Sequence, residues 1–336
     1  MAAPISIIVI GASAGGVETI RTVVTALPKT IAAAVFVTLH IGAHKSDLPW
    51  LLSRAGPLPA SHPEDGEAIQ SGRIYVAPPD HHMLVEQGKI RLTKGPRENW
   101  ARPAIDPLFR SAARAYGSAV IGVILTGGMN DGAAGLLEVK AQGGTTVVQD
   151  PTDAISSSMP QSALANVVVD HIAPAADIGR LLGELVAEAA KAARVESLAP
   201  AAGASLEPEM AAQFTLNRPI AATCPDCGGA VKQSERGALT QFSCHIGHVY
   251  TAEVMLAAQF LAMERFLEQA MRSLNERAEL CQLMSEKPQV GSQAAKRQQW
   301  DAARQEALEQ TQPLRDLLIR GWIHPAGDGQ VEALEP

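Results

Sequence analysis

The stretch ISIIVIGASAGG, residues 5–16, decides the fold class of this chain. Its apolar, β-branched beginning at residues 5–10 is typical of a buried strand, and a helical pattern follows at residues 17–27. Between them Ser13 stands among glycines and alanines, which leave the backbone room for a sharp strand-to-helix turn. The stretch therefore predicts a serine nucleophile at the carboxyl end of the first strand. A dinucleotide-binding turn or a plain tight connection is the alternative.

Two features favour the nucleophile. A nucleotide-binding fingerprint has a glycine where Ser13 stands and an acidic residue after the second strand, whereas the strand expected at residues 34–39 ends in His40. The helix after Ser13 also points backbone N–H groups at the space above the hydroxyl, which suits an oxyanion.

Strand and helix patterns alternate from residue 5 to residue 193, which predicts a doubly wound, mostly parallel, Rossmann-like α/β sheet. We expect strands at residues 5–10, 34–39, 73–77, 119–125, 145–149 and 167–171. We expect helices at residues 17–27, 48–53, 107–116, 133–141, 162–165 and 176–193. A hairpin at residues 83–86 and 89–92 is expected as an antiparallel addition to the sheet.

Composition narrows the functional classes. A chain of 336 residues suggests two or three units, and its net charge of −7 argues against nucleic acid as the main partner. The N-terminus shows no signal peptide and no apolar stretch reaches the ~18 residues of a membrane span, so we expect a cytoplasmic protein without membrane insertion. Three of the four cysteines fall in one short segment, which favours metal ligation over disulfides.

Ligands of open α/β sheets bind beyond the carboxyl ends of the strands, where Ser13, His40 and Asp131 are all expected. A hydroxyl, an imidazole that takes its proton and a carboxylate that orients the imidazole are the groups that acyl transfer needs. Each residue also has a structural alternative. His40 could be a surface histidine at a strand end, and Asp131 could be the N-cap of the following helix.

The chain order of serine, histidine and aspartate differs from that of the α/β-hydrolase fold. Taken together, several blocks resemble the catalytic domain of the chemotaxis protein-glutamate methylesterases, in that family's order and within residues 1–193. The blocks are IGASAGG at residues 10–16, Leu39-His40, VAPPDHHM at residues 76–83, RPAIDPLFRS at residues 102–111 and LTGGMNDGA at residues 125–133.

The resemblance implies hydrolysis of glutamate γ-methyl esters on chemoreceptor helices with release of methanol, and glutamine deamidation at the same sites as a second activity. By position it makes Ser13 the nucleophile, His40 the general base and acid, and Asp131 the orienting carboxylate. It places the oxyanion donors on the backbone N–H groups of Ala14 and Gly128. Many members have Gly-Met-Gly before the residue that precedes the aspartate, whereas this chain has Gly127-Gly128-Met129-Asn130.

The resemblance also places Arg102 beside the mouth of the active site. A guanidinium there could orient a carboxylate of the receptor helix, and a structural arginine tied to the loop of Asp106 is the alternative. Because the catalytic strand begins at residue 5, we expect a stand-alone form without the N-terminal receiver domain of response-regulator members, and no phosphorylation control in cis.

A second cluster of candidate site residues lies near the C-terminus. Cys224 and Cys227 form a Cys-x2-Cys knuckle, and Cys244 and His248 follow at a spacing typical of a structural zinc site. His245 is a competing fourth ligand, and three reduced surface thiols are the alternative to a metal. We expect zinc to support the fold of this segment and the catalysis to need no cofactor.

The predicted organisation is a catalytic domain at residues 1–193, a linker at 194–219, a zinc-ribbon-like segment at 220–250, a helical hairpin at 251–322 and a flexible tail at 323–336. The hairpin packs on itself or on the esterase, or else it docks a receptor bundle or forms a homo-oligomer. Two functions follow. The first is the methylesterase, and the second is a catalytically idle scaffold that recruits a signalling partner through the zinc segment and the helices.

Overall fold

The computed structural model of the chain describes residues 6–41, 46–196, 222–237, 239–286 and 294–320. A seven-stranded sheet forms its centre, in the order β3-β4-β2-β1-β7-β8-β9, and every pairing in that sheet is parallel. The strands are β1 (Ser6–Ala12), β2 (Ala33–Leu39), β3 (Ala60–Ser61), β4 (Ile74–Val76), β7 (Val120–Ile124), β8 (Thr145–Gln149) and β9 (His171–Ala173). The predicted α/β class with a mostly parallel sheet is confirmed.

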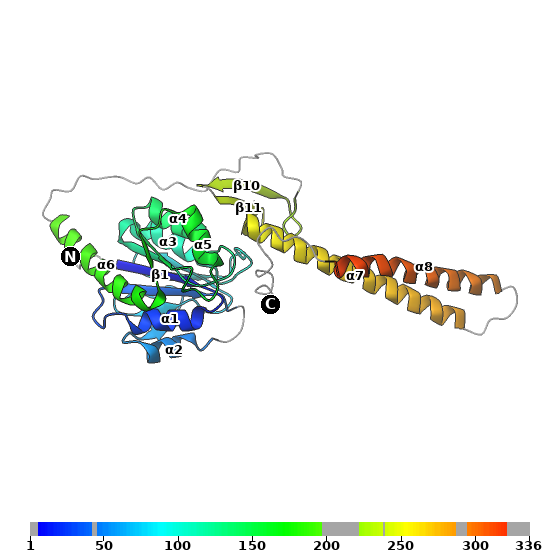
Figure 1. Ribbon diagram of the computed structural model, residues 1–336, viewed down its shortest axis with the longest axis horizontal. Coiled ribbons are helices and arrows are strands. Elements are labelled where there is room, and N and C mark those ends of the chain that lie inside the picture. Colours follow the sequence, from blue (N-terminus) through cyan, green and yellow to red (C-terminus); the bar gives the residue numbers. More distant parts are fainter. Residues whose placement is uncertain (1–5, 42–45, 197–221, 238, 287–293, 321–336) are drawn as a thin grey trace. The chain divides into compact units, whose positions relative to one another are not determined.

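Helices cover both faces of this sheet (Figure 1). On one face lie α1 (Gly16–Thr25), α2 (Leu48–Ala55) and α6 (Ala175–Glu196), and on the other lie α3 (Ile105–Tyr116), α4 (Ala133–Ala141) and α5 (Ser158–Asn166). Because side chains alternate along a strand, Ile8 and Ile10 of β1 enter one core while Ile7 and Val9 enter the other. Burial on both faces explains why β1 reads as a continuous apolar run.

Four details differ from the expectations. The hairpin of β5 (His82–Glu86) and β6 (Lys89–Thr93) is antiparallel, but it forms a sheet of its own because Met83, Val85 and Ile90 pack into the core beside α3. The last strand, expected at residues 167–171, begins at His171. A short 3-10 helix, η1 (Gly117–Ala119), precedes β7, and the two-residue strand β3 was not expected.

The C-terminal part contains β10 (Val231–Arg236), β11 (Leu239–Cys244) and β12 (Val249–Thr251), which pair antiparallel, then α7 (Ala252–Glu286) and α8 (Ala294–Leu318). The chain divides into two compact units at Met255 and Leu256. We call the last part of the first unit, residues 222–255, the Cys/His module.

The domain boundaries stay predictions, since most of the expected linker at 194–219 and all of the expected tail at 323–336 lie outside the described residues. None of the described helices combines the length and the apolar character that crossing a membrane would need.

Candidate active site

Ser13, His40 and Asp131 lie together at the carboxyl edge of the sheet, just beyond the neighbouring strands β1, β2 and β7. The Nδ1 atom of His40 is 3.2 Å from the Oγ atom of Ser13, and its Nε2 atom is 2.8 Å from Oδ2 of Asp131. These contacts join residues that are 27 and 91 positions apart in the chain. The parallel sheet is what brings them together, as the strand-end argument predicted.

The turn that carries Ser13 depends on glycines, which have no side chain. The backbone N–H of Ser13 donates to the carbonyl of Thr126, which ties the turn to the loop after β7. A Cβ atom added at Gly127 would lie 2.9 Å from the Cβ of Ser13 and 2.1 Å from the sulfur of Met159. Gly15 has a φ of +75°, and a Cβ there would lie 2.8 Å from Ile155. The close approach of the two loops therefore requires glycine at position 127.

The Asp131 carboxylate is buried and accepts four hydrogen bonds. Its Oδ2 accepts from His40 and from the N–H of Ile105, while Oδ1 accepts from the side-chain amide of Asn99 and, at 3.3 Å, from the N–H of Asp106. Burial alone would raise the pKa of Asp131, but the bonds from His40, Ile105 and Asn99 together hold that pKa below its usual range. The ionised form is thus the stable one.

Asp131 does not cap the following helix, because Gly132 occupies the N-cap of α4. Its ionised carboxylate instead accepts from Nε2 of His40, which places the ring proton on Nε2. The Nδ1 lone pair then faces the hydroxyl of Ser13 and can accept its proton. This is the proton path that a serine nucleophile requires.

Asn99 and Asp106 were not predicted as site residues. Asp106 is fully buried, and burial, aided by the nearby charge of Asp131, raises its pKa to about 8. Asn99 bridges the two carboxyl groups, since its Nδ2 lies 3.0 Å from Oδ1 of Asp131 and 3.1 Å from Oδ2 of Asp106. The site therefore holds one carboxylate and one neutral acid at neutral pH.

The predicted oxyanion donors are chain neighbours of Ser13 and of Gly127. Ala14 follows Ser13 at the exposed tip of the turn, and Gly128 follows Gly127, the residue whose missing Cβ lets the two loops meet. Arg102 is engaged elsewhere, because its Nε and Nη2 atoms both donate to Oδ1 of Asp80, at 2.9 and 2.6 Å. Its Nη1 atom donates to the carbonyls of Gly95 and Lys94, so its partners are Asp80 and the segment after β6, not the loop of Asp106.

The other predicted site residues form a compact cluster. The ligand atoms of Cys224, Cys227, Cys244 and His248 all lie within 4.8 Å of one another, so the cluster could hold a metal ion. His245, the competing ligand, is exposed and lies outside this group.

The distances between the ligand atoms of the cluster match those of a tetrahedral zinc site. The sulfurs of Cys227 and Cys244 are 3.6 Å apart, and Nδ1 of His248 lies 3.6 and 3.5 Å from the sulfurs of Cys224 and Cys244. Bonds to zinc of about 2.3 Å from sulfur and about 2.0 Å from nitrogen would set these separations at about 3.8 and 3.5 Å. Asp226 lies 3.8 Å from Nε2 of His248, where such sites commonly orient a histidine.

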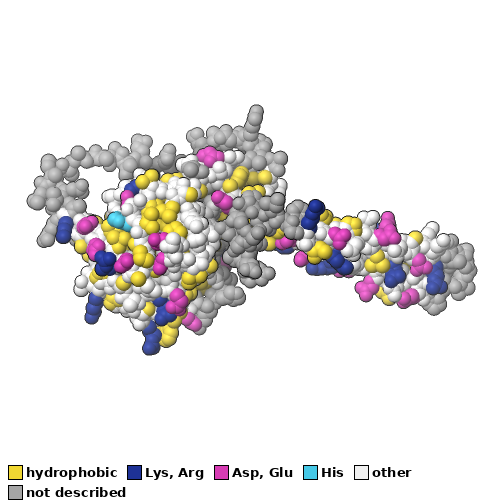
Figure 2. Space-filling view, in the orientation of Figure 1, with side chains coloured by type: hydrophobic (Ala, Val, Ile, Leu, Met, Phe, Trp, Pro, Cys, Tyr) yellow, Lys and Arg dark blue, Asp and Glu magenta, His cyan; other side chains and the backbone are white. Residues whose placement is uncertain are grey.

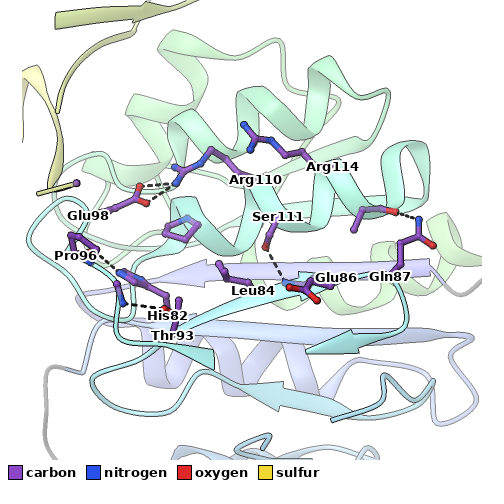
Figure 3. A pocket seen from close by; sticks show the side chains of 15 residues that line it. His82, Leu84, Glu86, Gln87, Thr93, Pro96, Glu98, Arg110, Ser111 and Arg114 are labelled. Atoms are coloured by element: carbon purple, nitrogen blue, oxygen red, sulfur yellow. Dashed lines mark hydrogen bonds and ion pairs between the residues drawn. The ribbon is translucent and has the colours of Figure 1, made fainter. Parts of the chain in front are cut away.

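A surface pocket of about 590 Å³ lies between β5, α3 and the loop before α3 (Figure 3). Ser13, His40 and Asp131 do not line it. Its edge shows an ion pair in which Arg110 of α3 donates two hydrogen bonds to Glu98, at 2.7 and 2.8 Å. Arg110 and Glu98 are both largely buried, so this pair fixes the loop that carries Asn99.

An α/β sheet whose carboxyl edge holds a serine, a histidine and an aspartate in hydrogen-bond contact has the arrangement that serine hydrolases use. Comparison with known proteins agrees. The family described as CheB methylesterase matches residues 8–182, just over half of the chain, and the chain belongs to this family. Both the predicted family and the predicted enzyme class are confirmed.

Individual relatives match the same part of the chain. A Leptospira interrogans protein, provisionally named protein-glutamate methylesterase/protein-glutamine glutaminase, is 42% identical over 168 residues, which are 49% of this chain and 86% of that protein. Protein-glutamate methylesterase/protein-glutamine glutaminase 1 of Burkholderia pseudomallei is 41% identical over 182 residues, 52% of this chain and 49% of that protein.

A solved structure, the CheB methylesterase catalytic domain of Thermotoga maritima, is 34% identical, with a TM-score of 0.52, and the match covers 54% of this chain and 98% of that one.

Proposed function

We propose that this chain is a serine esterase that demethylates glutamate γ-methyl esters on chemoreceptor-like signalling proteins. The contact of His40 with both Ser13 and Asp131 is the observation that carries the proposal. The names of the relatives support the substrate class, because those proteins are protein-glutamate methylesterases and protein-glutamine glutaminases.

The geometry suggests how the reaction proceeds. Oγ of Ser13 attacks the ester carbonyl while Nδ1 of His40 takes its proton, and Asp131 stabilises the imidazolium. The N–H groups of Ala14 and Gly128 would stabilise the oxyanion. His40 then protonates the departing methoxide, which leaves as methanol. Water, deprotonated by His40, cleaves the acyl-enzyme and returns Ser13 and a free glutamate. A glutamine side chain would follow the same steps with ammonia as the leaving group.

The surface beside the serine suits a protein substrate. Ile155 lies against Gly15 of the nucleophile turn and is 73% exposed, so it offers an apolar contact next to the reacting hydroxyl. In the orientation of Figure 2, hydrophobic side chains are visible over α4 and α5, among charged ones. A methylated receptor helix with an apolar face could use such contacts.

The described cysteines are all free of disulfides. Because thiols stay reduced in the cytoplasm, we propose that the reaction takes place there.

The test is methanol release from methylated receptor membranes by the full chain and by Ser13→Ala. We expect the wild-type protein to release methanol and the variant to release at least about 10³-fold less per unit time. Equal release by both proteins would reject the serine mechanism. No release by either, with a folded wild-type protein, would favour the idle scaffold.

We further propose that the Cys/His cluster binds one structural zinc ion through Cys224, Cys227, Cys244 and His248. Four protein ligands leave no open position, which is typical of structural sites. We expect about one zinc per chain by elemental analysis, and a sharp fall in Cys227→Ser. Cys281→Ser is the matched control, since Cys281 is the fourth free cysteine and lies in α7, outside the cluster. A zinc-free wild-type protein purified under reducing conditions would contradict this proposal.

A further inference from the structure

The short strand β12 links the metal cluster to the Asp131 loop. It follows His248 directly, and its middle residue, Tyr250, lies with its hydroxyl 3.4 Å from the sulfur of Cys224. At its last residue, the N–H of Thr251 donates to Oδ1 of Asn99, at 3.0 Å, and the hydroxyl of Thr251 donates to Oδ1 of Asn130, at 2.6 Å. Thr251, which makes these two contacts to the active site, is thus three positions after His248, a proposed metal ligand.

Both asparagines sit next to the orienting carboxylate. Asn99 donates to Asp131, and Asn130 precedes it in the chain. Asn130 also donates to Glu253, in the first turn of α7. The Cys/His module therefore hydrogen-bonds both the oxygen and the nitrogen of the Asn130 side-chain amide. Asn99, Asn130 and Thr251 are all buried, so water does not replace a lost partner without rearrangement.

The loop around Asn99 cannot hold its conformation by propensity alone. Asn99 and Trp100 have φ values of 47° and 65°, and two successive non-glycine residues in this region are costly. Such a conformation persists where the surroundings fix it. Here the N–H of Asn99 donates to the carbonyl of Val249 in β12, at 2.8 Å, and Glu98 is held on the other side by Arg110 (Figure 3).

Packing joins the same two regions. Trp100, from the Asn99 loop, and Met129, from the Asp131 loop, pack against the small core of the Cys/His module. Two of the metal ligands, Cys224 and Cys244, belong to that core. A module that lost its shape would therefore withdraw both the hydrogen bonds and the apolar support from the loops beside Asp131.

We propose that the Cys/His module positions the Asp131 carboxylate through Thr251, Asn99 and Asn130, so that metal loading of the module sets the turnover number of the esterase. The inference rests on the proposed function of Ser13, His40 and Asp131. Thr251, Asn99 and Asn130 are positioning residues, because they act on the imidazole only through Asp131. The metal supports catalysis from a distance and takes no part in the bond changes.

The first experiment leaves the metal in place and removes one hydrogen bond. Thr251→Val keeps the shape of the side chain but cannot donate to Asn130. We expect kcat for a small ester to fall about fivefold with KM unchanged, and the zinc content to stay the same. Thr240→Val is the matched control, because Thr240 lies on β11 of the same module and donates to Glu235 instead. The control should keep wild-type kcat.

The second experiment removes the metal from the full chain with a chelator and restores it with Zn²⁺. We expect kcat to fall at least tenfold on removal and to recover on addition. The same treatment of Ser13→Ala is followed by NMR, through the proton on Nε2 of His40 that is hydrogen-bonded to Asp131. That resonance should shift or broaden without metal, and it reports on the site whether or not the protein turns over an ester.

The outcomes separate the two proposals. If Ser13→Ala releases as much methanol as the wild-type protein, the proposed serine esterase function is rejected. The NMR resonance of His40 still tests, in that case, whether the Cys/His module positions Asp131. Unchanged kcat and an unchanged resonance after verified metal loss overturn the coupling, as does a Thr251→Val variant that behaves like Thr240→Val. If chelation unfolds the module so far that the protein precipitates, the Thr251→Val result decides.

Discussion

The triad residues and the Cys/His cluster are both small sets of converging side chains, but they are assembled in different ways. Ser13, His40 and Asp131 come from distant parts of the chain and are placed by a large, buried parallel sheet. The four residues of the cluster lie within residues 224–248 and are held by three short strands with a small core. We expect the sheet to fold without a ligand, whereas the metal that we propose for the second site would supply much of that site's stability.

The largest expected effect tests how far the triad acts as one unit. Ser13→Ala, His40→Ala and Asp131→Ala should each lower kcat by about 10³-fold or more, and the triple variant should be little worse than the worst single one. Single-turnover ester hydrolysis measures this. If the loss of kcat in the triple variant equalled the product of the three single losses, the three residues would act independently. The sheet would then not have assembled them into one catalytic unit.

A second prediction concerns the space between the two loops of the site. Gly127→Ala should destabilise the protein by roughly 1–3 kcal/mol and lower kcat, because its Cβ would meet both Met159 and Ser13. Urea unfolding and ester kinetics separate the two effects.

Gly95→Ala is the control for this prediction, because the nearest heavy atom to an added Cβ at Gly95 is 3.7 Å away. A Gly127→Ala variant as active as Gly95→Ala would show that the turn tolerates movement.

A third prediction follows from the neutral acid beside Asp131. The folded-state pKa of Asp106, about 8, lies above the ~3.9 of an unfolded chain, so its contribution to stability is complete below about pH 4 and is lost as pH rises through 8. Asp106→Asn removes this titration. Its free energy of unfolding should therefore rise relative to wild type from pH 4 to pH 9, as measured by urea unfolding. Parallel curves would mean that Asp106 is ionised throughout.

The smallest expected effect concerns Arg102. If this residue orients a carboxylate of the receptor, Arg102→Ala should raise KM for methylated receptor about tenfold and change KM for a small ester little. Asp80→Asn removes the negative charge with which the guanidinium pairs and is the matched comparison. Should both variants change both substrates alike, Arg102 supports the loop and does not bind substrate.

The residues that the parallel sheet brings together could be predicted from the sequence. Ser13, His40 and Asp131 each follow an apolar run, and parallel strands end at one edge, so their meeting could be expected without coordinates. The cluster could be expected because its ligand spacing is local. Its fourth member was named as His248 with His245 as a competitor, and the structure places His248 with the cysteines.

Residues held by loop-to-loop contacts could not be predicted. Asn99 lies in an aperiodic segment, and its partner Thr251 is 152 positions away. Asp80 lies in the sequence block at residues 76–83, but nothing in its spacing indicates the pair with Arg102. The hairpin of β5 and β6 was expected to extend the sheet, because pattern alone does not show that its apolar face meets α3.

The separation between Asn99 and Thr251 has a consequence for newly made protein. At synthesis rates of roughly 5–20 residues per second, Thr251 is added about 8–30 s after Asn99. From the moment that Asp131 is added, the growing chain has Ser13, His40 and Asp131 but lacks the strand that holds Asn99. If the proposed coupling holds, a nascent chain on the ribosome would be a poor esterase until β12 has been translated and the Cys/His module has bound the proposed metal.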